Sequence, residues 1–382
     1  MREFEESRIE TVTRSSDILI IGGGVTGLTT AWFLTNSGAD VTLVDRQRTG
    51  REASWAGAGM LPPGNLKTAA TPEARLRALS HSLWDELAAE LYDLTGIDTG
   101  YRRCGSIELF ADTDHQSESL QQWTAEQLSC ETLDGTELQQ RFPQIDRHHQ
   151  SAAWLPEFGQ VRNPRQLKAL RSACERRGVQ ILEHVDDVRL QDNGSGLVRA
   201  ESESHSLSAG RICVTAGAWS RRLLNDVRVE LPVQPVRGQI LQLKASQPLL
   251  DHVVELGRRY FVPRSDGLML IGSTEEHAGF AKQTTVDGIA QLLSFATGIL
   301  PDLSRAEIAR VWAGLRPGSP DELPYLGRVP EFENLFVGAG HFRSGLQMSP
   351  GTGLILSRLL LDQDSPIDLQ GLTVDRQHTT LV

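Results

Sequence analysis

A glycine-rich turn between two apolar stretches constrains the fold of this chain more than any other feature. Residues 18–21 (ILII) form a short apolar run of the kind that makes a buried strand in a parallel sheet. The sequence GGGVTG at 22–27 follows directly, and apolar residues at helical spacing then continue to Gly38, a suitable helix C-cap. A second apolar run at 41–44 ends on Asp45. This order predicts a β-α-β unit of an α/β fold.

The spacing within this unit is typical of a dinucleotide-binding site. Gly22 allows a tight turn, Gly24 lets a pyrophosphate approach the backbone, and Gly27 lets helix and strand pack closely. The helix N-terminus then faces the negative charge of the phosphates. Asp45 lies 18 positions after Gly27 (45 − 27), near the offset of about 20 expected for a carboxylate that binds a ribose hydroxyl. An ordinary glycine-rich turn is the alternative, and the pattern does not separate FAD from NAD.

Composition describes a globular protein and disfavours several kinds of partner. The 382 residues suffice for two domains, and 39% of them are hydrophobic. A formal net charge of −11 argues against nucleic acid, because phosphate binding needs a basic surface. The four cysteines are far apart, which favours reduced thiols over a zinc site or a disulfide framework. No apolar run approaches about 18 residues, so we expect a soluble cytoplasmic protein with no membrane span.

Two kinds of strand alternate along the rest of the chain. Buried apolar strands are expected at 179–182, 211–215 and 334–337. Alternating strands are expected at 231–243 and 259–271, the second centred on an Asp266-Gly267 hairpin. Helices should begin at Thr71 and Asn163, each followed by proline. Residues 101–147 are polar and irregular, apart from a strand at 106–110.

The interleaving of these strands predicts two domains that are both discontinuous in sequence. We expect a cofactor domain of mixed α/β class from residues 17–84, 148–222 and 311–382. A smaller antiparallel-sheet domain is expected from residues 85–147 and 223–310, and residues 1–16 are expected to be a loose extension. Small residues at 53–59 and 216–220 would let the backbone lie against a flat ligand. A surface loop is the alternative for residues 53–59.

Six stretches together resemble the D-amino-acid oxidase superfamily of flavoproteins, and most closely its glycine oxidases of thiamine biosynthesis. In chain order they are GREASWAGAGML, VTAGAWS, PVRGQIL, YFVPR, WAGLRPGSPDELPYLG and VGAGHFRSG. The likeness covers nearly the whole chain after the first sixteen residues. It implies a non-covalently bound FAD in a Rossmann-like domain, with the antiparallel substrate domain lying over the flavin.

The resemblance also implies which residues hold FAD. Val25, Thr26, Asp45 and Arg46 would bind the ADP half, and the backbone of Asp187 would contact the adenine. Ala53, Ser54, Ala58, Gly59 and Met60 would lie along the flavin and its linker. The pyrimidine side of the ring would be surrounded by His341, Phe342, Arg343, Ser344, Gly345, Leu346 and Gln347.

Tyr260, Arg316 and Arg343 fall where the family places its substrate contacts. Arg343 suits a carboxylate clamp, because a guanidinium gives two parallel charge-assisted hydrogen bonds. Tyr260 would add a third donor, and the redox chemistry belongs to FAD. A structural arginine at Arg316 and a half-buried sheet aromatic at Tyr260 are the alternatives. No metal or side-chain nucleophile is called for.

The activity implied is oxidation of glycine, sarcosine or a small D-amino acid by O2 to an imine and H2O2, supplying thiazole synthesis. Alternatives are a sarcosine oxidase, a D-amino-acid dehydrogenase or, from another class, a tRNA-modification oxidase domain. Sarcosine oxidases usually tie flavin to a late cysteine, whereas the last cysteine here is Cys213. Two positions depart from the family: Trp55 replaces a small residue, and Glu275 replaces an apolar one, which favours a larger amine or cation as substrate. We also expect a homo-oligomer.

Overall fold

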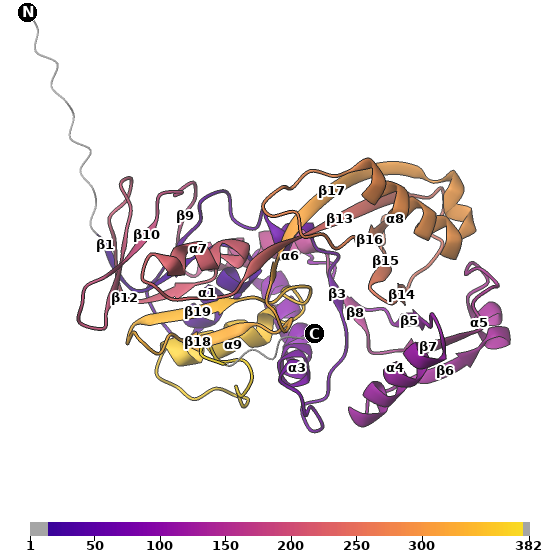
Figure 1. Ribbon diagram of the computed structural model, residues 1–382, viewed down its shortest axis with the longest axis horizontal. Helices are drawn as coiled ribbons and strands as arrows, with labels where there is room; N and C mark the ends of the chain where they lie inside the picture. The colour runs from indigo at the N-terminus through magenta and orange to yellow at the C-terminus, as the bar shows by residue number, and fades with distance from the viewer. Residues whose placement is uncertain (1–13, 377–382) are drawn as a thin grey trace, which may run out of the picture.

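The computed structural model describes residues 14–376, and Figure 1 shows an elongated molecule with one large sheet toward each end. Within that range the first sheet has six strands in the order β18-β19-β12-β1-β2-β9, all parallel except β18. Their bounds are Tyr325–Arg328, Leu335–Ala339, Leu207–Val214, Arg14–Ile21, Val41–Val44 and Gln180–Leu182. Because Ile18 and Ile20 enter one core cluster and Leu19 and Ile21 another, β1 is buried on both faces.

Helices cover the six-stranded sheet and complete the predicted β-α-β unit. Helix α1 packs against α6 and α9, and α3 packs against both of these. The bounds are Val25–Asn36 for α1, Ala53–Ala56 for α2, Pro72–Thr95 for α3, Asn163–Arg176 for α6, Ser220–Asn225 for α7 and Ser349–Leu360 for α9. Thr71 caps α3 as predicted, its hydroxyl accepting from the Ala74 N–H at 3.1 Å, and Gly96 ends that helix with a left-handed φ of +68°.

The second sheet has eight strands within the described range, in the order β17-β13-β16-β15-β14-β5-β7-β6. Their bounds are Glu307–Gly318, Gln234–Lys244, Leu268–Gly272, Arg259–Pro263, Val253–Leu256, Ser106–Leu109, Ser151–Leu155 and Glu131–Asp134. The predicted Asp266-Gly267 hairpin joins β15 to β16, with Gly267 at φ +81°. In Figure 1 the purple strands β5–β7 and the later strands β13–β17 therefore share one sheet, although they are far apart in sequence.

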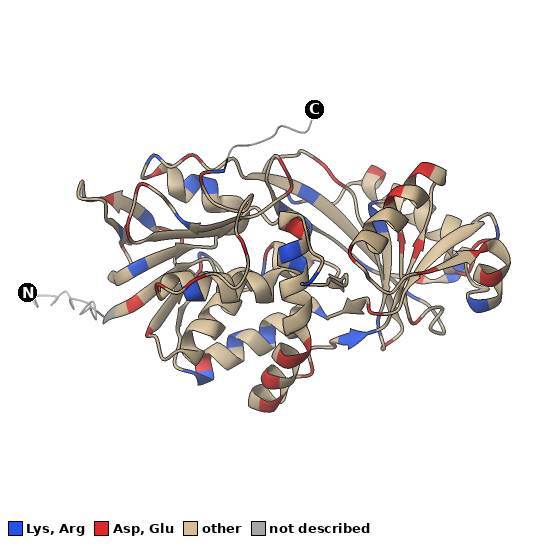
Figure 2. Ribbon diagram, turned by 90° about the horizontal axis from the view of Figure 1, so that it is seen from below, with Lys and Arg blue, Asp and Glu red and all other residues tan. Residues whose placement is uncertain are grey.

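The remaining elements are short or lie at the edges. Strands β3 (Met60–Leu61), β8 (Gly159–Gln160) and β4 (Arg102–Arg103) form a small sheet, and β10 (Arg189–Asp192) pairs with β11 (Val198–Glu201). The other helices are α4 (Thr113–Ala125), α5 (Gly135–Arg141), α8 (Val286–Ile299) and the 3-10 turns η1 (Gly217–Trp219) and η2 (Pro301–Arg305). Figure 2 shows Lys and Arg interspersed with Asp and Glu along the ribbon, not gathered in one basic stripe.

Three predictions differ from the structure or lie partly outside the described residues. Residues 101–147 are not irregular, since α4, β6 and α5 lie there. Residues 14–16 belong to β1, and the rest of the predicted loose extension lies outside the described residues. Strand β7 of the eight-stranded sheet lies wholly, and β17 partly, in ranges that we assigned to the cofactor domain. The domain limits stay a prediction. In the part of the chain that the structure describes, no helix has the length and apolar character needed to span a bilayer.

Candidate active site

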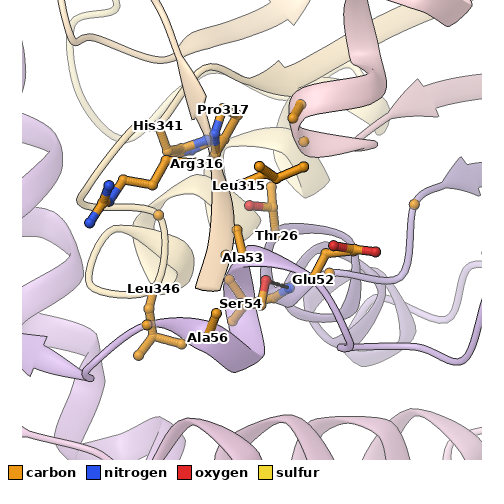
Figure 3. A pocket seen from close by; sticks show the side chains of 18 of the residues that line it. Thr26, Glu52, Ala53, Ser54, Ala56, Leu315, Arg316, Pro317, His341 and Leu346 are labelled. Atoms are coloured by element: carbon orange, nitrogen blue, oxygen red, sulfur yellow. Dashed lines mark hydrogen bonds between the residues drawn. The ribbon is translucent and has the colours of Figure 1, made fainter. Parts of the chain in front are cut away.

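One cavity of about 690 Å³ runs between the two sheets and takes in almost all of the predicted site. It is lined by Gly22, Gly24, Val25, Thr26, Asp45, Arg46, Ala53, Ser54, Ala58, Gly59, Met60, Tyr260, Arg316 and residues 341–347. Figure 3 shows Ser54 and Glu52 around α2 on one side, and Arg316 extending from β17 away from Glu52. Gly27 and Asp187 are the two predicted residues that do not line the cavity.

The glycine-rich turn fits the pyrophosphate of a dinucleotide. Gly22 has φ +116°, and a Cβ there would lie 2.5 Å from the Thr215 carbonyl oxygen. Gly24 has no side chain that could cap α1, and Gly24, Val25 and Thr26 at the start of this helix line the cavity. The N–H of Val25 donates to the Ser54 hydroxyl at 2.9 Å. Ser54 therefore ties α2 to the end of α1 that would hold the phosphates.

Gly27 has the packing role that its place in the motif predicts. A Cβ at this position would lie 2.0 Å from the Gly22 carbonyl oxygen, a contact between two backbone segments that neither can relieve. We expect Gly27→Ala to abolish FAD retention and to lower the free energy of unfolding by about 3 kcal/mol, at the upper end for overpacking. FAD per protein after gel filtration and urea unfolding measure the two effects.

Gly38→Ala is the matched control for this substitution. Gly38 has φ +81°, but a Cβ there would meet no atom within 4 Å. Its replacement should therefore cost only the conformational strain of about 1–2 kcal/mol and leave FAD bound. A Gly27→Ala protein that retained FAD as fully as Gly38→Ala would contradict the role assigned to Gly27.

Asp45 and Arg46 make the end of the cavity that suits an adenosine. The carboxylate of Asp45 accepts from the N–H groups of Gly23 at 2.7 Å and Gln47 at 2.8 Å. Burial raises the pKa of Asp45, while these two N–H groups oppose the rise. The guanidinium of Arg46 lies 3.7 Å from the centre of the Trp219 ring and pairs with Glu52 at 3.2 Å. Both side chains are thus fixed beside the place where a ribose hydroxyl would bind.

Asp187, whose backbone we predict to contact adenine, lies in a hydrogen-bonded turn. Its carboxylate accepts from the N–H of Glu203 and the hydroxyl of Ser202, so it holds the turn before β12 and leaves the cavity to its neighbours. The lining residues in this segment are Val185, Asp186 and Val188. The predicted contact between the Asp187 backbone and adenine therefore stays a prediction.

Arg316 is a half-buried cation whose hydrogen-bond partners among the described residues are neutral. Its guanidinium donates to the Ser273 hydroxyl at 2.6 Å and to the Thr274 carbonyl at 3.2 Å. No carboxylate forms an ion pair with it among residues 14–376. Burial lowers the pKa of Arg316 below the usual arginine value. Gly238 leaves room for it, because a Cβ there would lie 2.2 Å from Nη2. An arginine held in this way is ready to receive an anion.

Arg343 is already paired, contrary to what its predicted role as the main clamp requires. It donates to the Glu275 carboxylate at 2.8 Å and to the Arg258 carbonyl at 2.6 Å. Glu275 also accepts two bonds from Arg258, at 2.9 and 3.0 Å. Burial opposes ionisation of Glu275, but Arg258 and Arg343 outweigh it and lower its pKa. Glu275 lies behind the cavity wall and positions two arginines that line it.

Tyr260 and His341 complete the wall near Arg316. The Tyr260 ring packs on Gly272, where a Cβ would lie 2.4 Å from its hydroxyl oxygen. No hydrogen bond to this hydroxyl occurs within the described residues, and the side chain lines the cavity. Burial lowers the pKa of His341 to about 4, and its Nε2 lies 3.0 Å from the Thr352 hydroxyl. A neutral, anchored imidazole fits a ring contact better than a general base.

Several lining or supporting residues were not predicted. Arg264 is buried and donates to the Ala58 carbonyl at 2.6 Å, and Glu255 and Arg258 line the cavity beside Tyr260. Asn163 has a buried Oδ1 with no donor among the described residues, next to Gly59. Trp55 packs edge-on against Trp312, with the ring centres 5.6 Å apart, and is not among the residues that line the cavity. Only the YFVPR run, which contains Arg264, gave any sequence signal for these residues.

Comparison with known proteins agrees with this geometry. Residues 17–359 match the DAO family, described as FAD dependent oxidoreductase. The chain is 34% identical over 355 residues to a glycine oxidase of Pseudomonas putida, covering 93% of this chain and 97% of that protein. It is also 34% identical to the bifunctional protein ThiO/ThiG of Synechocystis sp., covering 91% of this chain and 52% of that protein.

A solved structure gives the same answer for the fold. The crystal structure of glycine oxidase from Geobacillus kaustophilus matches with a TM-score of 0.91 at 31% identity, covering 96% of this chain and 100% of that one. The expected mixed α/β fold with a Rossmann-like domain is thereby confirmed. The family match and the near full-length relatives show that this chain belongs to the DAO family of FAD-dependent oxidoreductases.

Proposed function

We propose that this enzyme oxidises a small amino acid, with glycine as the principal substrate and O2 as the electron acceptor. Glycine and O2 would give the imine and H2O2, and the imine would hydrolyse to glyoxylate and ammonia or enter thiazole synthesis. The similarity to proteins named glycine oxidase, and to one named ThiO/ThiG, supports this proposal. FAD, when bound, supplies the redox chemistry, accepting a hydride from the α-carbon and passing its electrons to O2.

The observation that carries the proposal is that, within residues 14–376, Arg316 has no carboxylate partner and the nearby Tyr260 hydroxyl has no hydrogen bond. A guanidinium binds a carboxylate through two parallel charge-assisted hydrogen bonds. Its donors to Ser273 and Thr274 fix its orientation before any substrate arrives. A half-buried cation also gains from an anion, because its surroundings screen the attraction less than bulk water does. We therefore assign the carboxylate of the substrate to Arg316 and Tyr260, with Arg343 as a secondary contact held by Glu275.

The residues assigned to FAD lie along the rest of the cavity. Asp45 would accept from a ribose hydroxyl, and the α1 N-terminus would hold the pyrophosphate. The small residues from Ala53 to Gly59 would leave room for the ring against α2 and β3. None of the four cysteines lines the cavity, which supports non-covalent binding. The predictions of a cytoplasmic location and a homo-oligomer stay predictions.

A peroxide assay across a small panel of amines tests the proposal. We expect H2O2 and glyoxylate to form in equal amounts from glycine, with slower turnover of sarcosine and small D-amino acids. Replacing O2 with a quinone dye under argon should not increase the rate. Turnover with the dye alone would favour the dehydrogenase instead. No turnover of any amino acid by the FAD-loaded protein would exclude the proposed function.

A further inference from the structure

The register of the eight-stranded sheet brings the carboxyl group of Glu255 to the substrate end of the cavity. Gly272 pairs with Tyr260, Tyr260 pairs with Glu255, and Glu255 pairs with Glu108. Directly paired residues project from the same face of a sheet. Tyr260 and Glu255 therefore stand side by side, and both line the cavity. Glu108 lies one strand further along the same row.

The two carboxyl groups of this row have different partners. Glu108 is held from behind by α4, accepting from the Ser119 hydroxyl and the Trp123 indole N–H, both at 2.8 Å. The Nε2 atom of His115 in α4 lies 3.7 Å from Oε1 of Glu108. Glu255 accepts from Ser106 at 3.0 Å through Oε2 only. Its Oε1 receives no hydrogen bond within residues 14–376.

The surroundings of Glu255 make its ionisation sensitive to pH near neutrality. Burial raises its pKa from 4.5 to about 7, and the nearby charge of Glu108 adds to the rise. The Ser106 hydroxyl and the Arg343 guanidinium oppose it. The residue is half-buried and lines the cavity. Glu255 Oε1 is therefore an acceptor at the cavity wall that a donor group of a ligand can reach.

We propose that Glu255 binds a protonated amino group of the substrate through Oε1. It thereby selects amino acids over small carboxylates that have no amino group. This rests on the proposed function, because it names the second half of the zwitterion whose carboxylate Arg316 holds. The ammonium is either the α-amino group or an amino group further along a larger substrate. Both share the same chemistry, and the experiment separates them.

Glu255→Gln tests the proposal, since it keeps the shape and a carbonyl oxygen for Ser106 but removes the charge. We expect the Kd of glycine to rise about 10- to 100-fold at pH 8.5, the range for hydrogen bonds to charged groups. This Kd is read by anaerobic stopped flow from the first change in flavin absorbance, before the flavin is reduced. The Kd of glycolate, which has the carboxylate but no ammonium, should stay within about twofold. Because binding is read directly, the result stands even if no amino acid is oxidised.

A diamine separates the two sources of the ammonium. If glycine binding is unchanged in Glu255→Gln and D-2,4-diaminobutyrate binding is lost, a side-chain amino group occupies the position. If glycine binding is lost, the α-amino group occupies it. Unchanged binding of both amines, or equal losses for glycine and glycolate, would overturn the proposal.

Glu108→Gln is the matched control on the same row. It should lower the pKa of Glu255 by removing a nearby negative charge, so that glycine binding strengthens at a lower pH than in the wild type. At pH 8.5 its Kd for glycine should equal that of the wild type within about twofold. A Kd at pH 8.5 that rose as much as in Glu255→Gln would also overturn the proposal.

The thermal stability of Glu255→Gln gives an independent test of the ionisation of Glu255. A carboxyl whose pKa is raised in the folded state binds its proton more tightly there, so stability falls as pH rises from 4.5 to about 7. Glu255→Gln removes this loss, and its Tm should exceed that of the wild type at pH 8.5. The difference should narrow at pH 5.5. A lower Tm at both pH values would show a packing defect, and Glu255→Asp would then replace it as the binding test.

Discussion

Replacing Arg316 with methionine should reduce kcat/KM for glycine by about 10²- to 10³-fold, while FAD stays bound. The loss corresponds to removing one partner of a buried, hydrogen-bonded charge pair, which costs about 2–5 kcal/mol. Methionine fills a similar volume without a charge, so the stack on Gly238 is preserved. Peroxide production against glycine concentration measures the effect, and flavin absorbance measures the cofactor content.

Arg343→Met distinguishes the contribution of Arg343 to substrate binding from that of Arg316. Glu275 would keep its two bonds from Arg258, so no carboxylate is left unpaired, and we expect a loss of about tenfold or less in kcat/KM. Arg316→Lys should recover part of the activity, since it restores the charge without the fork of donors. If Arg343→Met lost more than Arg316→Met, the carboxylate would belong to Arg343, as the sequence alone had favoured.

The cofactor-binding unit could be predicted because its signals are local. Strand, turn, helix and second strand follow one another between residues 18 and 45, and each has its own pattern. The polar segment 101–147 also held local signals that were overlooked. Asp134 and Glu137 form a capping box at the start of α5, and Asp112 caps α4. The low hydrophobicity of residues 101–147 led to the prediction of irregular structure, although surface helices need only one apolar stripe.

The division of roles among the arginines could not be predicted, because it depends on distant partners. Arg343 and Glu275 are 68 positions apart, and the Arg343–Arg258 contact spans 85. The sequence predicted both arginines as substrate contacts but not which of them is free to bind an anion. The place of Glu255 in the site could not be predicted from the sequence for a related reason. Its place beside Tyr260 and Glu108 depends on strand register, and β5 joins the sheet from almost 150 residues earlier in the chain.

Arg264 is the clearest case of a residue whose importance only the structure reveals. It lies at the end of the β15–β16 hairpin, in the sheet opposite the Rossmann-like unit, and its side chain crosses to the loop before β3. There it donates to the Ala58 carbonyl at 2.6 Å, the Val161 carbonyl at 3.0 Å and Gln160 Oε1 at 2.9 Å. Burial lowers the pKa of Arg264 to about 10, so it stays charged at neutral pH.

Arg264→Met should therefore leave three buried acceptors without a donor and lower the free energy of unfolding by about 3–5 kcal/mol. Ala58 lines the cavity, so FAD should also be lost on gel filtration. Arg162→Met is the control, because Arg162 pairs with Asp266 of the same hairpin at 2.5 Å but is partly exposed. Its loss should cost about 1 kcal/mol or less. Equal stability and equal FAD content in the two variants would mean that the charge of Arg264 does not hold the hairpin against the cofactor loop.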